Sequence, residues 1–189
     1  MQHIKILFSV VFLLFFSTLS QSDSLPRESE LQAEAIDIVK TFSETLKPKL
    51  KQAIQSGGLE HAIKICSVEA PRIASSLSDD TGWSVKRVSL KPRNTSTAAP
   101  DAFEIEVLNR FNELQISGEA APLLEYSEFV DDKFRYMKAQ AVEGICLGCH
   151  GSSIPPGVKN LLKEYYPDDV ATGYSLGEVR GAFSLAKDL

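Results

Sequence analysis

Residues 124–151 read LEYSEFVDDKFRYMKAQAVEGICLGCHG, and this stretch carries signals for both the fold and a cofactor. Its first part predicts two strands, residues 124–130 and 133–142, because the side chains of the second alternate in polarity. Only Asp131 and Asp132 separate the two strands, and a linker of two residues is typical of a β-hairpin. The stretch therefore predicts an antiparallel pair of strands that leads directly into the residues of a candidate site.

Residues 146–150 form a Cys-x-x-Cys-His motif, the attachment sequence of a c-type haem. Each cysteine sulfur adds across a vinyl group of the haem to form a thioether, and the adjacent histidine binds the iron. The two-residue spacer lets Cys146 and Cys149 reach neighbouring vinyl groups while His150 points at the metal. The sequence therefore predicts one covalent haem c, with His150 as an axial ligand.

Other interpretations of the motif explain less. A redox-active Cys-x-x-Cys pair is expected near a strand-to-helix turn of a βαβ unit, and no such pattern surrounds this motif. A zinc site needs four ligands in a tetrahedral arrangement, which the neighbours Cys149 and His150 cannot easily supply together. A structural disulfide or another metal site remains the alternative to covalent haem.

The first 22 residues have the pattern of a secretory signal peptide. Lys5 supplies a positive charge, residues 6–16 are almost all apolar, and small residues follow. This pattern predicts cleavage and an exported or periplasmic location, which is where haem c is assembled. Residues 23–189 then form one haem-binding domain without a membrane span; a retained N-terminal anchor is the alternative.

The remaining pattern predicts helices followed by an antiparallel sheet. Apolar residues recur at three- and four-residue spacing in two N-terminal segments, and Gly57-Gly58 separates them. We expect helices over residues 27–55, 59–77, 101–116 and 158–166, strands over 83–89 and 178–189 beside the hairpin, and a loop over 90–100. This order defines an α+β fold with long N-terminal helices and helical insertions.

Several segments together resemble a known family. They are Cys66-Ser67-x-Glu69-Ala70-Pro71, Gly82-Trp83-x-Val85-x-Arg87-x-Ser89, Arg93-Asn94, the haem motif with Gly151, and Gly177-Glu178-Val179-Arg180-Gly181-Ala182-Phe183-Ser184. The family consists of exported single-haem proteins and sensor input domains with a PAS-like sheet, long catalogued as a domain of unknown function. The resemblance spans roughly residues 30–187. It implies a PAS-like antiparallel sheet, with haem held between helix and sheet and Cys66 as the distal iron ligand. The sequence departs from the family at Thr95-Ser96-Thr97, where Pro and Asn are more usual.

The residues themselves leave the second axial ligand open. Cys66 is the one cysteine outside the motif, and it falls on the apolar face of the second helix. A thiolate ligand would stabilise ferric iron and lower the reduction potential. His61, Met137 and an open site are the other candidates. Arg93, or alternatively Arg72, is expected to pair with a haem propionate, because guanidinium groups bind carboxylates well.

Three classes of function fit such a chain. The resemblance favours a redox or ligand sensor, a small exported cytochrome would be an electron carrier, and a haem peroxidase is the least favoured because no distal His–Arg pair stands out. The formal net charge of −5 argues against nucleic acid as a partner. We expect a redox partner protein or a small gaseous ligand instead, and a homodimer through the first helix is an open alternative.

Overall fold

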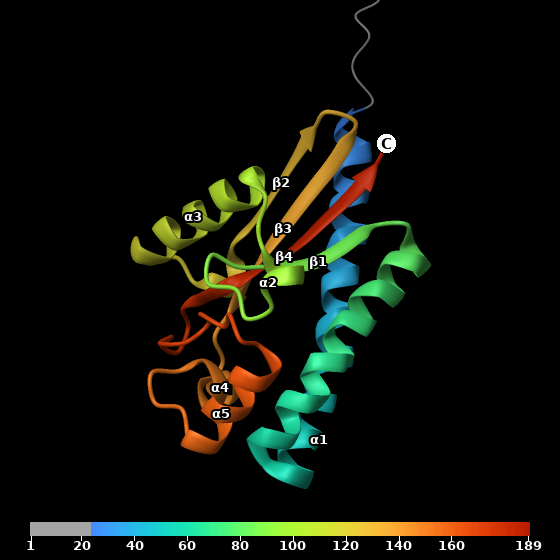
Figure 1. Cartoon of the computed structure of the whole chain (residues 1–189). Coiled ribbons are helices and arrows are strands. Elements are labelled where there is room, and N and C mark those ends of the chain that lie inside the picture. The colour runs from blue at the N-terminus through green and yellow to red at the C-terminus, as the bar shows by residue number, and fades with distance from the viewer. Residues whose placement is uncertain (1–23) are drawn as a thin grey trace, which may run out of the picture.

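The computed structural model describes residues 24–189, so the predicted signal peptide lies outside the described residues. Two long antiparallel helical legs and a four-stranded sheet dominate the structure (Figure 1). The predicted α+β class, the antiparallel sheet and the long N-terminal helices are therefore confirmed. Within residues 24–189, no helix has both the length and the apolar character needed to cross a membrane.

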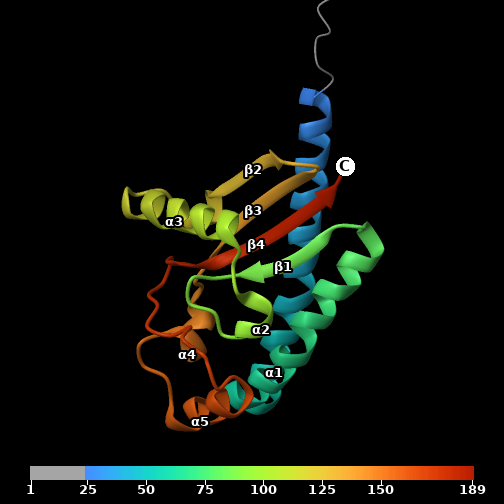
Figure 2. The same ribbon diagram turned by 45° about the horizontal axis from the view of Figure 1, so that its top comes forward.

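The N-terminal helical hairpin, α1, runs from Ser24 to Thr81 and changes direction at two glycines. Gly57 has non-helical dihedral angles, and Gly58 has a φ of 73°, a conformation that glycine adopts without steric cost. The two legs lie side by side in both views (Figures 1 and 2). The predicted break at these glycines is confirmed, and the second leg continues four residues beyond its expected end.

The sheet has the strand order β1-β4-β3-β2, and every neighbouring pair is antiparallel. Its strands are β1 (Ser84–Val88), β2 (Glu125–Val130), β3 (Lys133–Ala141) and β4 (Val179–Asp188). The predicted hairpin is confirmed, because Val130 pairs with Lys133 across a two-residue turn. β4 is central and joins β1 to the hairpin.

Helices cover the two faces of the sheet. On one, which we call the α1 face, Leu31, Ala35, Ile38 and Phe42 pack against Trp83, directly before β1, and against apolar side chains of β1, β3 and β4: Val85, Phe134, Tyr136, Phe183 and Leu185. On the other, the α3 face, helix α3 (Ala102–Ile116) buries Val107, Leu108 and Phe111 against Val88, Met137 and Ala182. The side chain of Asp101 accepts a hydrogen bond from the Glu104 amide, and the side chain of Glu104 accepts one from the Asp101 amide, so a capping box starts α3 where predicted.

The segment between β3 and β4 lies at the turn of the helical hairpin (Figure 2). It contains η2 (Gly144–Cys146), α4 (Leu147–His150) and α5 (Pro156–Tyr165), and α5 packs against α1 through Ile63, Val158 and Leu162. Four short helices fall outside the expected elements: η2 and α4, then α2 (Thr95–Ala98), inside the predicted loop, and η1 (Ala121–Leu123). The expectation of an unbroken loop over residues 90–100 was therefore wrong; Asn94 accepts the amide hydrogens of Thr97 and Ala98, which closes one helical turn.

Candidate cofactor site

A cavity of about 730 Å³ lies between α1, the α1 face of the sheet and the segment that follows β3. Its wall includes Cys66 from the second leg of α1 together with Cys146, Cys149 and His150. These residues are about 80 positions apart in the chain, and the fold brings them to one enclosed space. We call this space the cofactor cavity.

The Cys-x-x-Cys-His segment is held in a tight helical geometry. Cys146 ends η2, and Cys149 and His150 lie in the single turn of α4. Gly148 lies close to α1, because a Cβ atom there would lie 2.9 Å from Leu59 Cδ1 and would displace that side chain. The spacer therefore sets how closely the motif approaches the helix, beyond the flexibility expected of it.

The imidazole of His150 is oriented for coordination through Nε2. Its Nδ1 lies 2.8 Å from the carbonyl oxygen of Ala171, and Arg93 Nη1 lies 3.4 Å from Nε2. A carbonyl can only accept and a guanidinium can only donate, so these two contacts favour the tautomer with hydrogen on Nδ1. Arg180 Nε lies 3.1 Å from Nδ1 and would donate to it only in the other tautomer. With hydrogen on Nδ1, the lone pair of Nε2 is the one that a metal would bind, in the arrangement that orients most histidine ligands, and Arg93 Nη1 lies against it in this structure.

Burial and nearby positive charge keep His150 neutral. Burial, and then the guanidinium groups of Arg180 and Arg93, lower its pKa to about 2. Neutral imidazole is the form that binds metals.

All three cysteines of the chain have free thiols in the structure. Burial raises the pKa of each thiol, and the charge of Cys149 adds to this effect at Cys66. Cys66 is therefore close enough to the motif for their charges to interact. The structure contains no disulfide between Cys146 and Cys149, and residues 24–189 contain no group of three or more His, Cys, Asp or Glu residues placed to hold a metal ion.

Two candidates for the second axial ligand lie away from the cavity. His61 is exposed on the second leg of α1 and packs near Gly57. Met137 is fully buried, but it belongs to the apolar cluster on the α3 face. Neither side chain lines the cofactor cavity. Of the predicted alternatives, Cys66 and an open site remain compatible with this structure.

Arg93 lines the cavity but is already held by protein groups. Its Nε donates to Asp169 Oδ2 at 3.0 Å, and its Nη2 donates to the carbonyl oxygen of Cys149. These contacts tie the residues before α2 to the motif and to the loop after α5. The pairing of Arg93 with a propionate stays a prediction. Arg72, the alternative, is exposed and forms a 2.7 Å ion pair with Glu69.

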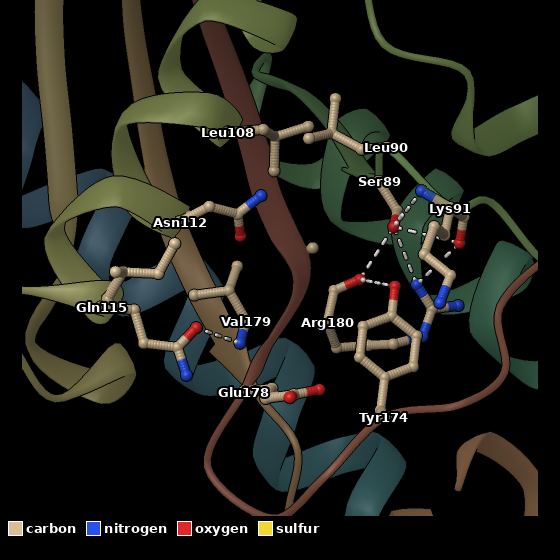
Figure 3. Close-up of a pocket in the computed structure, with 12 residues that line it drawn as sticks. Ser89, Leu90, Lys91, Leu108, Asn112, Gln115, Tyr174, Glu178, Val179 and Arg180 are labelled. Atoms are coloured by element: carbon tan, nitrogen blue, oxygen red, sulfur yellow. Dashed lines mark hydrogen bonds between the residues drawn. The ribbon is translucent and has the colours of Figure 1, made fainter. Parts of the chain in front are cut away.

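Two further arginines line the cavity, Arg87 and Arg180, and sequence reasoning assigned neither of them a role. Arg180 Nη1 donates to Ser89 Oγ at 2.9 Å and to the Lys91 carbonyl at 3.2 Å, and its guanidinium stacks over Tyr174 (Figure 3). A second cavity of about 420 Å³ lies beside these residues, between α3 and the start of β4. The sequence signal that could have identified these arginines is a charged residue close to apolar residues of a strand. In β1, for example, Arg87 lies between the buried Val85 and Val88.

An α+β chain with helical legs over one sheet face, and a cavity that gathers thiols and an imidazole, has the architecture of a cofactor-binding domain. The family model described as Tll0287-like matches residues 20–187. The chain belongs to the Tll0287-like family.

One solved structure shares the fold. The crystal structure of the cyanobacterial heme-protein Tll0287 matches with a TM-score of 0.67 and 21% sequence identity, over 84% of this chain and 95% of that chain. The comparison with curated proteins gave no match.

Proposed function

We propose that this chain is an exported haem protein with one covalent haem c, bound by Cys146 and Cys149 and coordinated by His150. The observation that carries the proposal is the meeting of these three side chains on the wall of one cavity, with His150 Nδ1 held by the carbonyl oxygen of Ala171. The structural relative is described as a cyanobacterial heme-protein, which supports the same cofactor here.

The residues present fit such a group in size, chemistry and charge. The cavity volume of about 730 Å³ falls in the range of about 300–1,000 Å³ typical of cofactor sites. Apolar side chains of α1, such as Leu50, Ile54 and Ile63, would cover the porphyrin faces, and the arginines supply counter-charge for carboxylates. Haem iron in such a site supplies one-electron redox chemistry and binding of diatomic gases.

We propose Cys66 as the second axial ligand. It lines the same cavity as Cys146, Cys149 and His150. His61 and Met137 lie elsewhere. An anionic sulfur ligand favours ferric iron and a low potential. That chemistry suits redox or ligand sensing, in which a change of oxidation state or a gas displaces the sulfur.

Electron transfer is the second candidate function. Ile145, directly before the first motif cysteine, is 40% exposed, and the neighbouring Glu143 forms an exposed ion pair with Lys47 at the cavity rim. A cofactor attached at this edge would be near solvent and accessible to a redox partner protein. We propose such a protein, or a small gas, as the partner of the mature chain.

Substitution of the motif tests the covalent haem. Co-expression with a haem c maturation system should give a protein whose haem stays attached in a denaturing gel, as seen by haem staining. Cys146→Ala with Cys149→Ala should abolish the stained band. A band that persists in the double variant contradicts covalent attachment.

Substitution of Cys66 tests the second ligand. Cys66→Ala should convert a six-coordinate low-spin ferric spectrum to a high-spin or water-bound one, because alanine cannot replace the sulfur. The exposed His61→Ala variant, one helix turn away, is the matched control and should leave the spectrum unchanged. An unchanged spectrum in Cys66→Ala shows that the sulfur is not bound. Rapid CO binding by the reduced wild-type protein would favour sensing over a coordinatively saturated electron carrier.

A further inference from the structure

Arg87 places a guanidinium group in the cofactor cavity without an anionic partner. It lies on β1 opposite Phe183 of β4, on the face of the sheet that packs against α1. Its Cζ atom lies 5.1 Å from the centre of the Phe42 ring. Within residues 24–189 the guanidinium has this ring contact but no ion pair or hydrogen bond.

The other two arginines of the cavity are engaged differently. Arg93 has an ion pair with Asp169, and Arg180 donates to Ser89 Oγ and to a carbonyl oxygen (Figure 3). Their guanidinium groups brace the loops around the motif. Arg87 is therefore the cavity arginine whose hydrogen-bond donors are free for a group bound in that space.

Burial makes the unpaired charge of Arg87 costly. It lowers the pKa of Arg87, and the anionic form of Cys66 is the strongest opposing influence, ahead of Tyr166. The effect is reciprocal: burial raises the pKa of the Cys66 thiol, and the charge of Arg87 is the largest influence that lowers it. Arg87 and Cys66 line the same cavity, one from β1 and the other from the second leg of α1. In a medium of low dielectric constant, the Arg87 charge would stabilise a negative charge that developed on this sulfur.

We propose that Arg87 is a positioning residue for the second axial ligand, and that it stabilises the negative charge on the Cys66 sulfur when this sulfur binds iron. The inference rests on the proposed function, in which Cys66 is that ligand. Hydrogen bonds and charge next to a metal-bound sulfur hold the ligand and tune the metal. Loss of the Arg87 charge should therefore make Cys66 easier to displace by a neutral ligand.

A titration of the ferric holoprotein with imidazole, followed by optical spectroscopy, tests this prediction. Arg87→Leu should raise the apparent affinity for imidazole about 10-fold or more, because loss of a favourable charge interaction weakens the competing sulfur ligand. Arg87→Lys keeps the charge and should restore most of the wild-type affinity. Arg72→Leu removes an exposed arginine from the same helical leg as Cys66, and it should have no effect. An imidazole affinity in Arg87→Leu equal to that of the wild type would overturn the proposal.

A double variant separates Cys66 from the haem as the target of Arg87. In a Cys66→Ala background, Arg87→Leu should leave imidazole affinity unchanged, because the sulfur is already absent. An equal effect in both backgrounds would mean that Arg87 acts on the haem itself, for example on a propionate, and the proposal would be wrong. If Cys66→Ala alone leaves the spectrum unchanged, the proposed ligand fails, independently of Arg87.

A polar variant keeps the test decisive if leucine prevents folding. Arg87→Gln retains hydrogen-bond donors without the charge, and it should resemble the leucine variant in its tighter imidazole binding. Wild-type affinity in Arg87→Gln would overturn the role of the charge.

Discussion

The helical hairpin meets the same sheet face in two different ways. Near the start of α1, Leu31, Ala35, Ile38 and Phe42 are buried and pack directly against the sheet. Towards the turn, Leu50, Ile54, Leu59 and Ile63 border a cavity of about 730 Å³ instead. We call these the packed region and the cavity region.

The difference shows that contact between the helical hairpin and the sheet both stabilises the fold and leaves space for a bound group. Protein interiors are normally close-packed, so a large cavity sacrifices van der Waals contacts. The packed region supplies the burial that holds the helices on the sheet. The cavity region leaves apolar surface and an unpaired guanidinium for a bound group to cover.

Truncation of one side chain in each region is the most direct test of the difference between the packed region and the cavity region. Phe134 is fully buried and packs edge-on against Trp83, so Phe134→Ala should reduce the free energy of unfolding by about 3–5 kcal/mol. Leu50→Ala enlarges a space that already exists, so in the haem-free protein it should cost about 1 kcal/mol or less. Urea denaturation of both variants measures the contrast. Equal losses would show that the two regions are packed alike.

Substitution of Gly181 tests the close approach of β1 and β4 beside the cavity. A Cβ atom at this position would lie 2.3 Å from the carbonyl oxygen of Val88. Gly181→Ala should therefore force the two strands apart and lower the free energy of unfolding by about 1–3 kcal/mol. Gly144→Ala, where a Cβ atom meets nothing within 4 Å, is the control and should have little effect. Thermal unfolding of the pair distinguishes steric contact from a general cost of removing glycine.

The smallest expected effect is a pH dependence in the packed region. Burial alone would raise the pKa of Glu125, but hydrogen bonds from Tyr136 and Lys138 outweigh it and hold the pKa below its ordinary value. A lowered folded pKa contributes stability above the unfolded value of about 4.3, and this stability is lost as the pH falls through the folded pKa.

Glu125→Gln should therefore cost about 1 kcal/mol at pH 7 and nothing once wild-type Glu125 is protonated. Urea denaturation at a series of pH values measures the difference. The exposed Glu128→Gln, whose carboxylate accepts only from Tyr126, should show no such trend. A difference for Glu125→Gln that persists at acid pH would refute the ionic contribution.

Local patterns were sufficient to predict most of the fold. Glycine at positions 57 and 58 marked the helix break, and the Asp131-Asp132 turn marked the hairpin. The order of the strands was not predictable in this way, because pairing of β1 with β4 depends on packing between distant segments. The helical turn of α2 was missed because its few residues carry no apolar periodicity.

The candidate site was most predictable where its residues follow one another in the sequence. The Cys-x-x-Cys-His motif at residues 146–150 is recognisable from the sequence alone, and Cys66 was identified because it is the one cysteine outside that motif. Arg87 and Arg180 were missed because an arginine in a strand is usually solvated, and only the assembled cavity shows that these line it. Likewise, Met137 could be placed away from the cofactor cavity only once the structure showed on which face of β3 it lies.

The central place of β4 has a consequence for the order of events during biosynthesis. β4 lies between β1 and β3, yet it follows residues 144–151 in the chain. The motif is therefore synthesised before the strand that joins β1 to the β2–β3 hairpin. Strand pairing between segments so far apart in sequence is slow. Until β4 pairs with both neighbours, the Cys-x-x-Cys-His segment lacks the strand that closes the sheet beside it.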